Sequence, residues 1–392
     1  MRNFAIGLAA VGLVNAACAQ SSITLFGVVD AGISSYTSKS VDARTQRGQR
    51  ASQLAMSSSG LASSRLGFRG VEDLGGGLAA SFWLEAPMSN DTGADALSFG
   101  RRSTVSLSGG FGEIRLGRDV NATFVNDFVF DPLGVNGVGT SLLYRAGTVM
   151  SKMGVPPTPG LSPILANAYA RSNNMVAYLL PASLGGFYGQ VQYAFDEKIH
   201  YGAGGLPAAG TDVRSGRYVG GRFGYAQGPL DVALAASRST LLDDRAAGLT
   251  LRQDTVNLAA AYDLGPAKLF AEVTRMANRT IVTGPVVGAP REVDLTGFLF
   301  GVNVPVGPGT IRASYAQVRY DYDGATTPDP KANQLALSYV HNLSKRTALY
   351  ASAARIQNKN GAALSVGSPS FPGGGFTPKS STGYDLGLRH AF

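Results

Sequence analysis

Short runs in which apolar and polar residues alternate recur along almost the whole chain. The last run, residues 384–392, places Tyr384, Leu386 and Leu388 on one face, and small, polar or charged residues such as Asp385 on the other. A period of two residues is typical of a β-strand, whereas an amphipathic helix repeats about every 3.6 residues. Helical periodicity over ten residues or more is not convincing outside the N-terminal segment and the segment 120–169. The pattern therefore predicts an all-β protein.

Turn residues divide these runs into sixteen expected strands, and an even number is typical of bacterial outer-membrane barrels. Their expected ranges are 22–36, 53–70, 78–88, 100–109, 112–119, 170–180, 186–197, 215–227, 229–240, 253–264, 266–278, 291–305, 309–321, 332–343, 346–358 and 382–392. Short connections, such as 110–111 and 265–266, alternate with long ones, such as 37–52 and 359–381. Tight periplasmic turns and longer external loops alternate in this way in outer-membrane barrels. We therefore expect a sixteen-stranded antiparallel transmembrane β-barrel.

The N-terminal residues indicate export. A positively charged start precedes an apolar run, residues 4–14, that is too short to span a bilayer, and residues 17–19 form a small-residue cleavage site. We expect a signal peptide over residues 1–19 and a multi-pass outer-membrane barrel over residues 20–392. The alternative, a lipoprotein signal acylated at Cys18, lacks the leucine that usually stands three residues earlier. Because Cys18 is the only cysteine, the mature chain can form no disulfide.

The composition supports a wall that faces lipid. Charged residues make up only 15% of the chain, which is low for a soluble surface of this size. The formal net charge is +8, and its Lys and Arg residues are scattered singly or in pairs. A nucleic-acid-binding surface would cluster them with aromatic residues, so we expect no nucleic-acid partner. Positive charge that lines a pore, and so favours anions, fits the scatter better.

The segment 120–169 is too long for an ordinary connection. It contains Phe124, Phe128 and Phe130 together with several prolines and glycines. It is either a disordered external loop or a loop that folds inward and packs through its own aromatic residues. The aromatic residues favour the inward loop.

Strand alternation assigns several arginines to the barrel lumen. Arg65 shares a face with Arg69, opposite an apolar pair, and Arg115 lies on the polar side of its strand. Arg171 lies on the face opposite Val176. An arginine that faced lipid near the middle of the bilayer would cost ~2–4 kcal/mol, so the inward assignment is the safer one.

The pair Arg101 and Arg102 is ambiguous. Strict alternation puts Arg102 with Thr104 on the polar face, and Arg101 with Val105 on the apolar face. A pair at the end of a strand can escape this rule through a bulge. Both arginines are therefore kept as candidates for the pore.

Conspicuous sequence blocks extend from the start of the expected mature chain to its end. They are residues 22–27, 64–77, 101–105, 112–118, 171–174, 339–347 and 389–392. Through these blocks the chain resembles the trimeric general porins of Gram-negative outer membranes, of the beta-proteobacterial type. The resemblance implies a homotrimer of sixteen-stranded barrels, each with its third loop, residues 120–169 by position, folded into the pore.

The resemblance also implies passive diffusion of small hydrophilic solutes, anionic or neutral, without a cofactor, through a constriction with arginines on the wall and acids on the loop. The arginines that match the wall motif, followed by those that alternation adds, are Arg65, Arg101, Arg171, Arg102 and Arg115. The nearest acids on the loop are Asp127 and Asp131. The final aromatic, Phe392, is similar to the tag that the barrel-assembly machinery reads. Outer-membrane lipid and lipopolysaccharide are further expected partners.

Two other functions compete with a channel. An outer-membrane barrel enzyme of the phospholipase or protease type would need a nucleophile, a base and an orienting group within hydrogen-bond distance. His341, Asn342 and Ser344 contain these residue types, but Ser344 lies in an expected turn only three residues from His341. The three histidines lie far apart in the sequence, so we expect no metal site. A soluble exported β-protein is disfavoured by the low charge and the alternating loops.

Overall fold

The computed structural model describes most of the expected mature chain. It covers residues 22–94, 97–153, 168–196, 213–214, 216–244, 248–283, 291–324, 326–367 and 375–392, so the expected signal peptide lies outside the described residues. The elements are β1 (Ser22–Asp42), β2 (Gly48–Ser58), β3 (Arg65–Gly75), β4 (Leu78–Pro87), β5 (Arg102–Gly109), β6 (Gly112–Val120), α1 (Ala122–Val129), α2 (Leu142–Met150), β7 (Arg171–Leu179), β8 (Phe187–Ala194), β9 (Val213–Arg214), β10 (Tyr218–Gln227), β11 (Leu230–Asp244), β12 (Leu249–Asp263), β13 (Lys268–Val282), β14 (Arg291–Val306), β15 (Gly309–Tyr322), β16 (Lys331–Asn342), β17 (Thr347–Lys359) and β18 (Phe376–Ala391).

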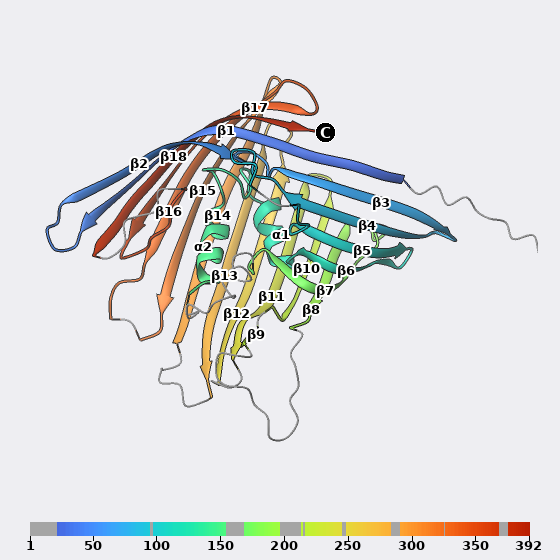
Figure 1. Ribbon diagram of the computed structural model, residues 1–392, viewed down its shortest axis with the longest axis horizontal. Helices are drawn as coiled ribbons and strands as arrows, with labels where there is room; N and C mark the ends of the chain where they lie inside the picture. Colours follow the sequence, from blue (N-terminus) through green and yellow to red (C-terminus); the bar gives the residue numbers. More distant parts are fainter. Residues whose placement is uncertain are drawn as a thin grey trace, which may run out of the picture.

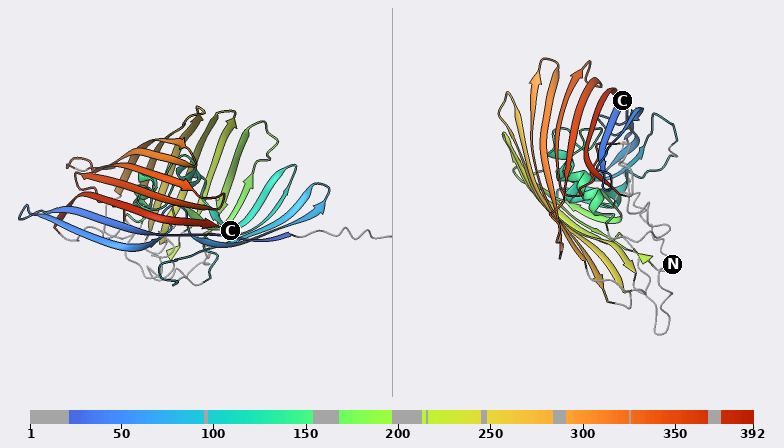
Figure 2. Two further views of the ribbon diagram at one scale, coloured as in Figure 1. Left: turned by 90° about the horizontal axis from the view of Figure 1, so that it is seen from above. Right: turned by 90° about the vertical axis from the view of Figure 1, so that its left-hand side faces the viewer.

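One antiparallel sheet forms the wall and closes where the first strand meets the last. In Figures 1 and 2 the blue β1 lies beside the red β18, and the two pair from Val28 with Ala391 to Asp42 with Phe376. The described residues form eighteen strand segments. However, β2 and β3 pair with successive parts of β1, and β9 and β10 with successive parts of β11. Each of these two pairs makes one wall strand, so the prediction of sixteen strands is confirmed.

The two ends of the barrel differ in how well the sequence predicted them. Short turns stand where expected, as at residues 110–111 and 307–308. At the other end several strands, such as β1, β11 and β13, are longer than expected. The predicted long loop 37–52 was wrong, because β1 continues to Asp42, β2 begins at Gly48, and only residues 43–47 form a turn. Here both faces of the strands carry polar residues, so alternation is lost although the backbone pairing continues.

The predicted strand 53–70 is interrupted inside the barrel. Residues 59–64 leave the wall between β2 and β3, and Ser59 has a positive φ of 69°. The buried Asp30 carboxylate stabilises this break, because its Oδ2 accepts hydrogen bonds from the backbone N–H groups of Leu61 (2.7 Å) and Ala62 (2.6 Å). The break ends at Arg65 and places that arginine on the lumen face of β3.

The outward face of the last strand is the predicted apolar stripe. Leu386 is 64% exposed and Tyr384, Leu388 and Phe392 are also exposed, whereas the neighbouring Asp385 is 3% exposed. Apolar side chains on the outside and a polar residue inside are the arrangement of a lipid-facing wall.

The loop between β6 and β7, called loop 3 below, folds into the barrel (Figure 1), and its described parts are residues 121–153 and 168–170. Helix α1 packs on β8, β10, β11 and β12, and α2 packs on β13, β14 and β15. Leu142 and Leu143 are fully buried in one cluster with Leu295 and Val318 of the wall. Both helices are short, so tertiary packing stabilises them more than intrinsic propensity does. Among the described residues, no helix is long and apolar enough to cross a membrane.

Glycines on β14 allow loop 3 to approach the wall. A Cβ atom on Gly297 would lie 2.7 Å from Cδ2 of Leu143, and one on Gly301 would lie 2.5 Å from Cγ of Pro132. Any larger residue at these positions would push the loop toward the pore.

Residues 361–367, which follow β17, also turn inward, although the sequence predicted an external loop over 359–381. Leu364 and Val366 are buried in the same cluster as α2. Arg145 of α2 donates hydrogen bonds from Nη1 to the Ser365 carbonyl (3.0 Å) and from Nη2 to the Val366 carbonyl (2.9 Å). This second segment therefore covers loop 3 from inside the barrel.

The seam depends on the last residue. The backbone N–H and C=O of Phe392 pair with those of Gly27 at 3.1 Å each, and the ring lies against the Gly27 Cα.

Deleting Phe392 should leave Gly27 unpaired and lower the yield of folded barrels several-fold, without changing the conductance of those that form. The change in electrophoretic mobility on heating measures the folded fraction. Phe392→Tyr is the matched control, and a normal yield after the deletion would contradict the expectation.

Candidate functional site

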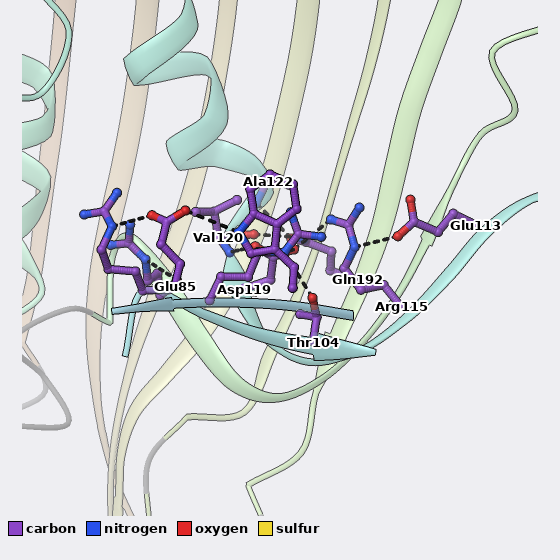
Figure 3. Close-up of polar contacts among 12 residues, drawn as sticks. Glu85, Thr104, Glu113, Arg115, Asp119, Val120, Ala122 and Gln192 are labelled. Carbon is purple, nitrogen blue, oxygen red and sulfur yellow. Dashed lines mark hydrogen bonds and ion pairs between the residues drawn. The ribbon is translucent and has the colours of Figure 1, made fainter. Parts of the chain in front are cut away.

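Loop 3 leaves the wall beside the lumen face of β4–β6. Gln192 of β8 holds its start: Oε1 accepts the N–H of Ala122 (2.8 Å), and Nε2 donates to the carbonyl of Val120 (2.8 Å). Figure 3 shows these contacts among polar residues of neighbouring strands, with Glu85 on one side and Arg115 and Glu113 on the other. Because the two helices pack mainly on β8 and β10–β15, these charged residues lie on the part of the lumen wall that the helices leave open.

Three arginines that the sequence singled out lie close together on this wall. They are Arg65 on β3, Arg101 just before β5, and Arg171 at the start of β7, and they are called the arginine cluster below. Glu85 of β4 links the first two, since its Oε1 lies 2.5 Å from Nε of Arg101 and 3.7 Å from Nε of Arg65. Nε of Arg171 donates to the Arg101 carbonyl (2.8 Å).

The arginine cluster has more positive than negative charge. Glu85 is the one carboxylate that forms an ion pair with it among the described residues. Arg171 instead lies with its guanidinium carbon 6.0 Å from the centre of the Phe124 ring of α1, so this arginine spans from the wall to loop 3. A ring face attracts a cation without neutralising its charge. The cluster therefore keeps a net positive field at the depth of loop 3.

Arg101 and Arg102 both reach the lumen side. Arg102 lies opposite Glu85 in the register of β4 and β5, and it shares the inner face with Thr104, as strict alternation requires. Arg101 lies in a bend before the strand begins, where alternation does not apply, and its side chain turns to Glu85. The sequence left open which of the two arginines faces the pore, and in the structure both of them do.

Arg115 lies inside the barrel but is paired. Its Nε donates to Glu113 (2.8 Å) and its Nη1 to Asp119 (2.7 Å), as Figure 3 shows for the first contact. Two carboxylates of the same strand compensate its charge, so Arg115 stabilises the end of β6 from which loop 3 departs and adds little to the field in the lumen.

Asp127 and Asp131 are not where the sequence predicted. Both were expected to face the arginines across the pore, but they are 0% and 5% exposed, beneath loop 3. Asp127 accepts a hydrogen bond from the hydroxyl of Tyr169 (2.7 Å) and lies against Glu272 of β13. Oδ1 of Asp131 accepts the N–H groups of Leu133 (2.7 Å) and Gly134 (3.1 Å). Asp127 therefore attaches loop 3 to the wall, since Asn257 of β12 also donates to it (3.4 Å), whereas Asp131 stabilises a turn within the loop.

Sequence reasoning missed three residues that shape the site. Glu85 could have been found from the sequence, because alternation in the expected strand 78–88 puts it on the same face as Trp83. In the structure, Nε1 of Trp83 donates a hydrogen bond to Glu85 (3.3 Å). Arg222 of β10, which donates to Asn126 of α1 (2.6 Å), and Arg145 of α2 had no such signal. Their roles follow from where loop 3 lies.

Known proteins resemble this chain along its whole length. A family model described as Gram-negative porin matches residues 7–361. Outer membrane porin protein 32 of Delftia acidovorans is 37% identical over 399 residues, and the alignment covers 100% of both chains. The matched length includes every strand that carries the arginine cluster.

Solved structures share the fold. An anion-selective porin from Comamonas acidovorans superposes with a TM-score of 0.73 at 36% identity, covering 95% of this chain and 100% of its own. The in-vitro folded trimer form of OmpT, an outer membrane protein of Vibrio cholerae, gives a TM-score of 0.58 at 13% identity, covering 95% and 99%. At that identity the second likeness concerns the fold alone.

The stability of the buried part of loop 3 should depend on pH. Burial raises the pKa of Asp131 from 3.8 to about 7, and Asp127 nearby adds to the rise. A raised pKa favours the folded state at low pH, and this contribution is lost as the pH rises through about 7. We expect the unfolding temperature of the purified barrel to fall by about 2 °C between about pH 4 and pH 8, and less in Asp131→Asn.

The control for this titration is Asp42→Asn. Asp42 is the last residue of β1, beside the turn 43–47, and backbone N–H groups of Thr45 and Arg44 lower its pKa, so its contribution is lost only as the pH falls. Removing it should leave the decrease toward pH 8 intact. An Asp131→Asn barrel with the pH dependence of the original chain would show that Asp131 does not control the stability of loop 3.

Proposed function

The chain belongs to the Gram-negative porin family, and on that premise we propose that its arginine cluster makes the channel anion-selective. As a member of the family, the protein is an outer-membrane porin, a multi-pass β-barrel with a channel for small hydrophilic solutes. Sixteen strands are wide enough to leave water inside the wall, and an inward loop narrows that space.

The observation that carries the proposal is the imbalance of charge around Glu85. One carboxylate serves both Arg65 and Arg101, and Arg171 contacts a carbonyl and a ring in place of an acid. Arginine stays protonated at any physiological pH, so the positive potential at this depth is permanent. Such a potential raises the local concentration of anions and repels cations. The similar solved structure that is described as an anion-selective porin supports this direction.

Loop 3 supplies rigidity to the opposite side of the channel. Asp127 contacts Asn257 of the wall, Asp131 stabilises a turn within the loop, and Arg145 binds the loop to residues 365–366. A fixed loop gives a fixed passage, so selection among solutes would follow from size and charge alone. The expected solutes are small anions and neutral hydrophilic molecules.

The proposed partners follow from the outer surface. Exposed apolar residues such as Leu335 and Leu386 suit outer-membrane lipid, and ion-paired arginines such as Arg275 and Arg319 suit the phosphates of lipopolysaccharide. A homotrimer is the assembly that the sequence resemblance to the trimeric general porins implies. The exposed terminal Phe392 suits recognition by the barrel-assembly machinery.

The comparisons give no support to the enzyme alternative. Ser344 accepts hydrogen bonds from the backbone N–H groups of Arg346 and Thr347, as a turn residue does. His341 contacts the Tyr339 hydroxyl at 3.1 Å. Within the described ranges, no group of three or more His, Cys, Asp or Glu is placed to hold a metal ion.

The reversal potential of the purified protein in a planar bilayer, under about a tenfold KCl gradient, tests the proposal. The original chain should give an anion-selective value, and replacing Arg65, Arg101 and Arg171 together with Gln should move it toward zero. Glu85→Gln is the matched variant of opposite sign, since it removes the negative charge and should increase the preference for anions. Cation selectivity, or an unchanged value in the triple variant, would reject the proposal.

A further inference from the structure

A second positively charged region lies on the lumen wall between the arginine cluster and the short turns. It is a groove of about 420 Å³ on the inner faces of β1 and β3–β6, called the Arg69 groove below. Arg69 lies four residues along β3 from Arg65, toward the turn at Gly76. Short turns face the periplasm in outer-membrane barrels, so the groove lies on the periplasmic side of the arginine cluster.

Arg69 has no carboxylate partner. Its guanidinium carbon lies 5.7 Å from the ring centre of Phe26 and 5.5 Å from that of Trp83. Among the described residues, no hydrogen bond or ion pair of its side chain is found. The two rings, themselves 5.0 Å apart in an edge-to-face contact, thus support the cation without using its N–H donors. All five donors remain available to a ligand.

Arg102 presents a second cation to the same groove. Its guanidinium carbon lies 4.6 Å from the ring centre of Trp83, and its Nε donates to Thr104 (3.1 Å). Its Nε also forms an ion pair with Asp119 at 3.7 Å, so the Nη groups are the ones available to a ligand. Trp83 itself is fixed by its hydrogen bond to Glu85. Two guanidinium groups are therefore held in place around one indole.

The remaining lining decides which anion fits. Hydroxyl groups of Thr24, Ser81 and Ser106 line the groove, and these can donate to or accept from hydroxyl groups of a ligand. The groove is also lined by Glu113 and Arg115, which form an ion pair with each other at 2.8 Å. The Trp83 ring is already in contact with both arginines and with Phe26, so it offers little area for stacking an aromatic ligand. The volume lies within the range of about 300–1,000 Å³ that is usual for small-ligand sites.

We propose that the Arg69 groove is a binding subsite for small hydroxylated carboxylates, the class of the sugar acids. The carboxylate accepts hydrogen bonds from the Arg69 and Arg102 guanidinium groups, and the ligand hydroxyls pair with the serine and threonine side chains. This inference rests on the proposed function, because ligands reach the groove through the channel. The subsite is separate from the arginine cluster and adds recognition of hydroxyl groups to the selection by charge.

The test uses Trp83 as the reporter, since it is the only tryptophan in the chain. Gluconate is titrated into the purified, detergent-folded protein while tryptophan fluorescence is recorded. We expect a saturable change, with the midpoint raised about tenfold in Arg69→Gln because a charge-assisted contact is lost. Arg312→Gln is the matched control: it removes a lumen arginine on β15 that has no ring beneath it, and its midpoint should stay within about twofold.

Two further probes separate the parts of the inference. Acetate, which lacks hydroxyl groups, should bind at least several-fold more weakly than gluconate, and erythritol, which lacks charge, should not saturate. Arg69→Lys keeps the charge but not the planar stack, and should give an intermediate midpoint even if Arg69→Gln folds poorly. Equal midpoints in Arg69→Gln and the original chain, or for acetate and gluconate, would overturn the inference. The reversal potential tests the proposed function independently of this binding signal.

Discussion

Pairing between the first and last strands is the constraint on which the whole structure depends. Inside a bilayer every backbone N–H and C=O must find a partner within the protein, so an open sheet is not an option. The β1–β18 seam closes the sheet, and Phe392 and Gly27 complete it at the short-turn end. Closure also fixes the register of every strand, and with it the height at which Arg65, Glu85 and Arg102 meet.

Loop 3 can pack inside the closed barrel only because part of the inner wall is apolar. This explains why Leu295 and Leu299 of β14 and Val318 of β15 face inward. They are covered by Leu142 and Leu143 of α2, so they meet protein and no water. The opposite wall keeps its arginines and hydroxyl groups because nothing covers it. The position of loop 3 thus divides the lumen into a packed side and a wet side.

The sequence predicted the wall well, because lipid imposes a period of two on every spanning strand. It predicted less where that period fails: residues 37–42 continue β1 without alternation, and residues 59–64 leave the wall through contacts with Asp30. Alternation placed Arg65, Arg102 and Arg115 inward but could not say which were paired. Asp127 and Asp131 were misplaced because a loop has no period, and burial beneath it depends on residues as distant as Glu272.

The arginines of the lumen differ in what holds them, and that difference separates their roles. Arg115 is held by two carboxylates, so its charge is compensated and its contribution is mechanical. Arg65 and Arg101 share one carboxylate and keep part of their charge. Arg69 is held by rings alone, which fix a guanidinium without occupying its donors. An arginine that is held by carboxylates therefore stabilises the structure, whereas an arginine that is held by rings keeps its N–H donors available to a solute.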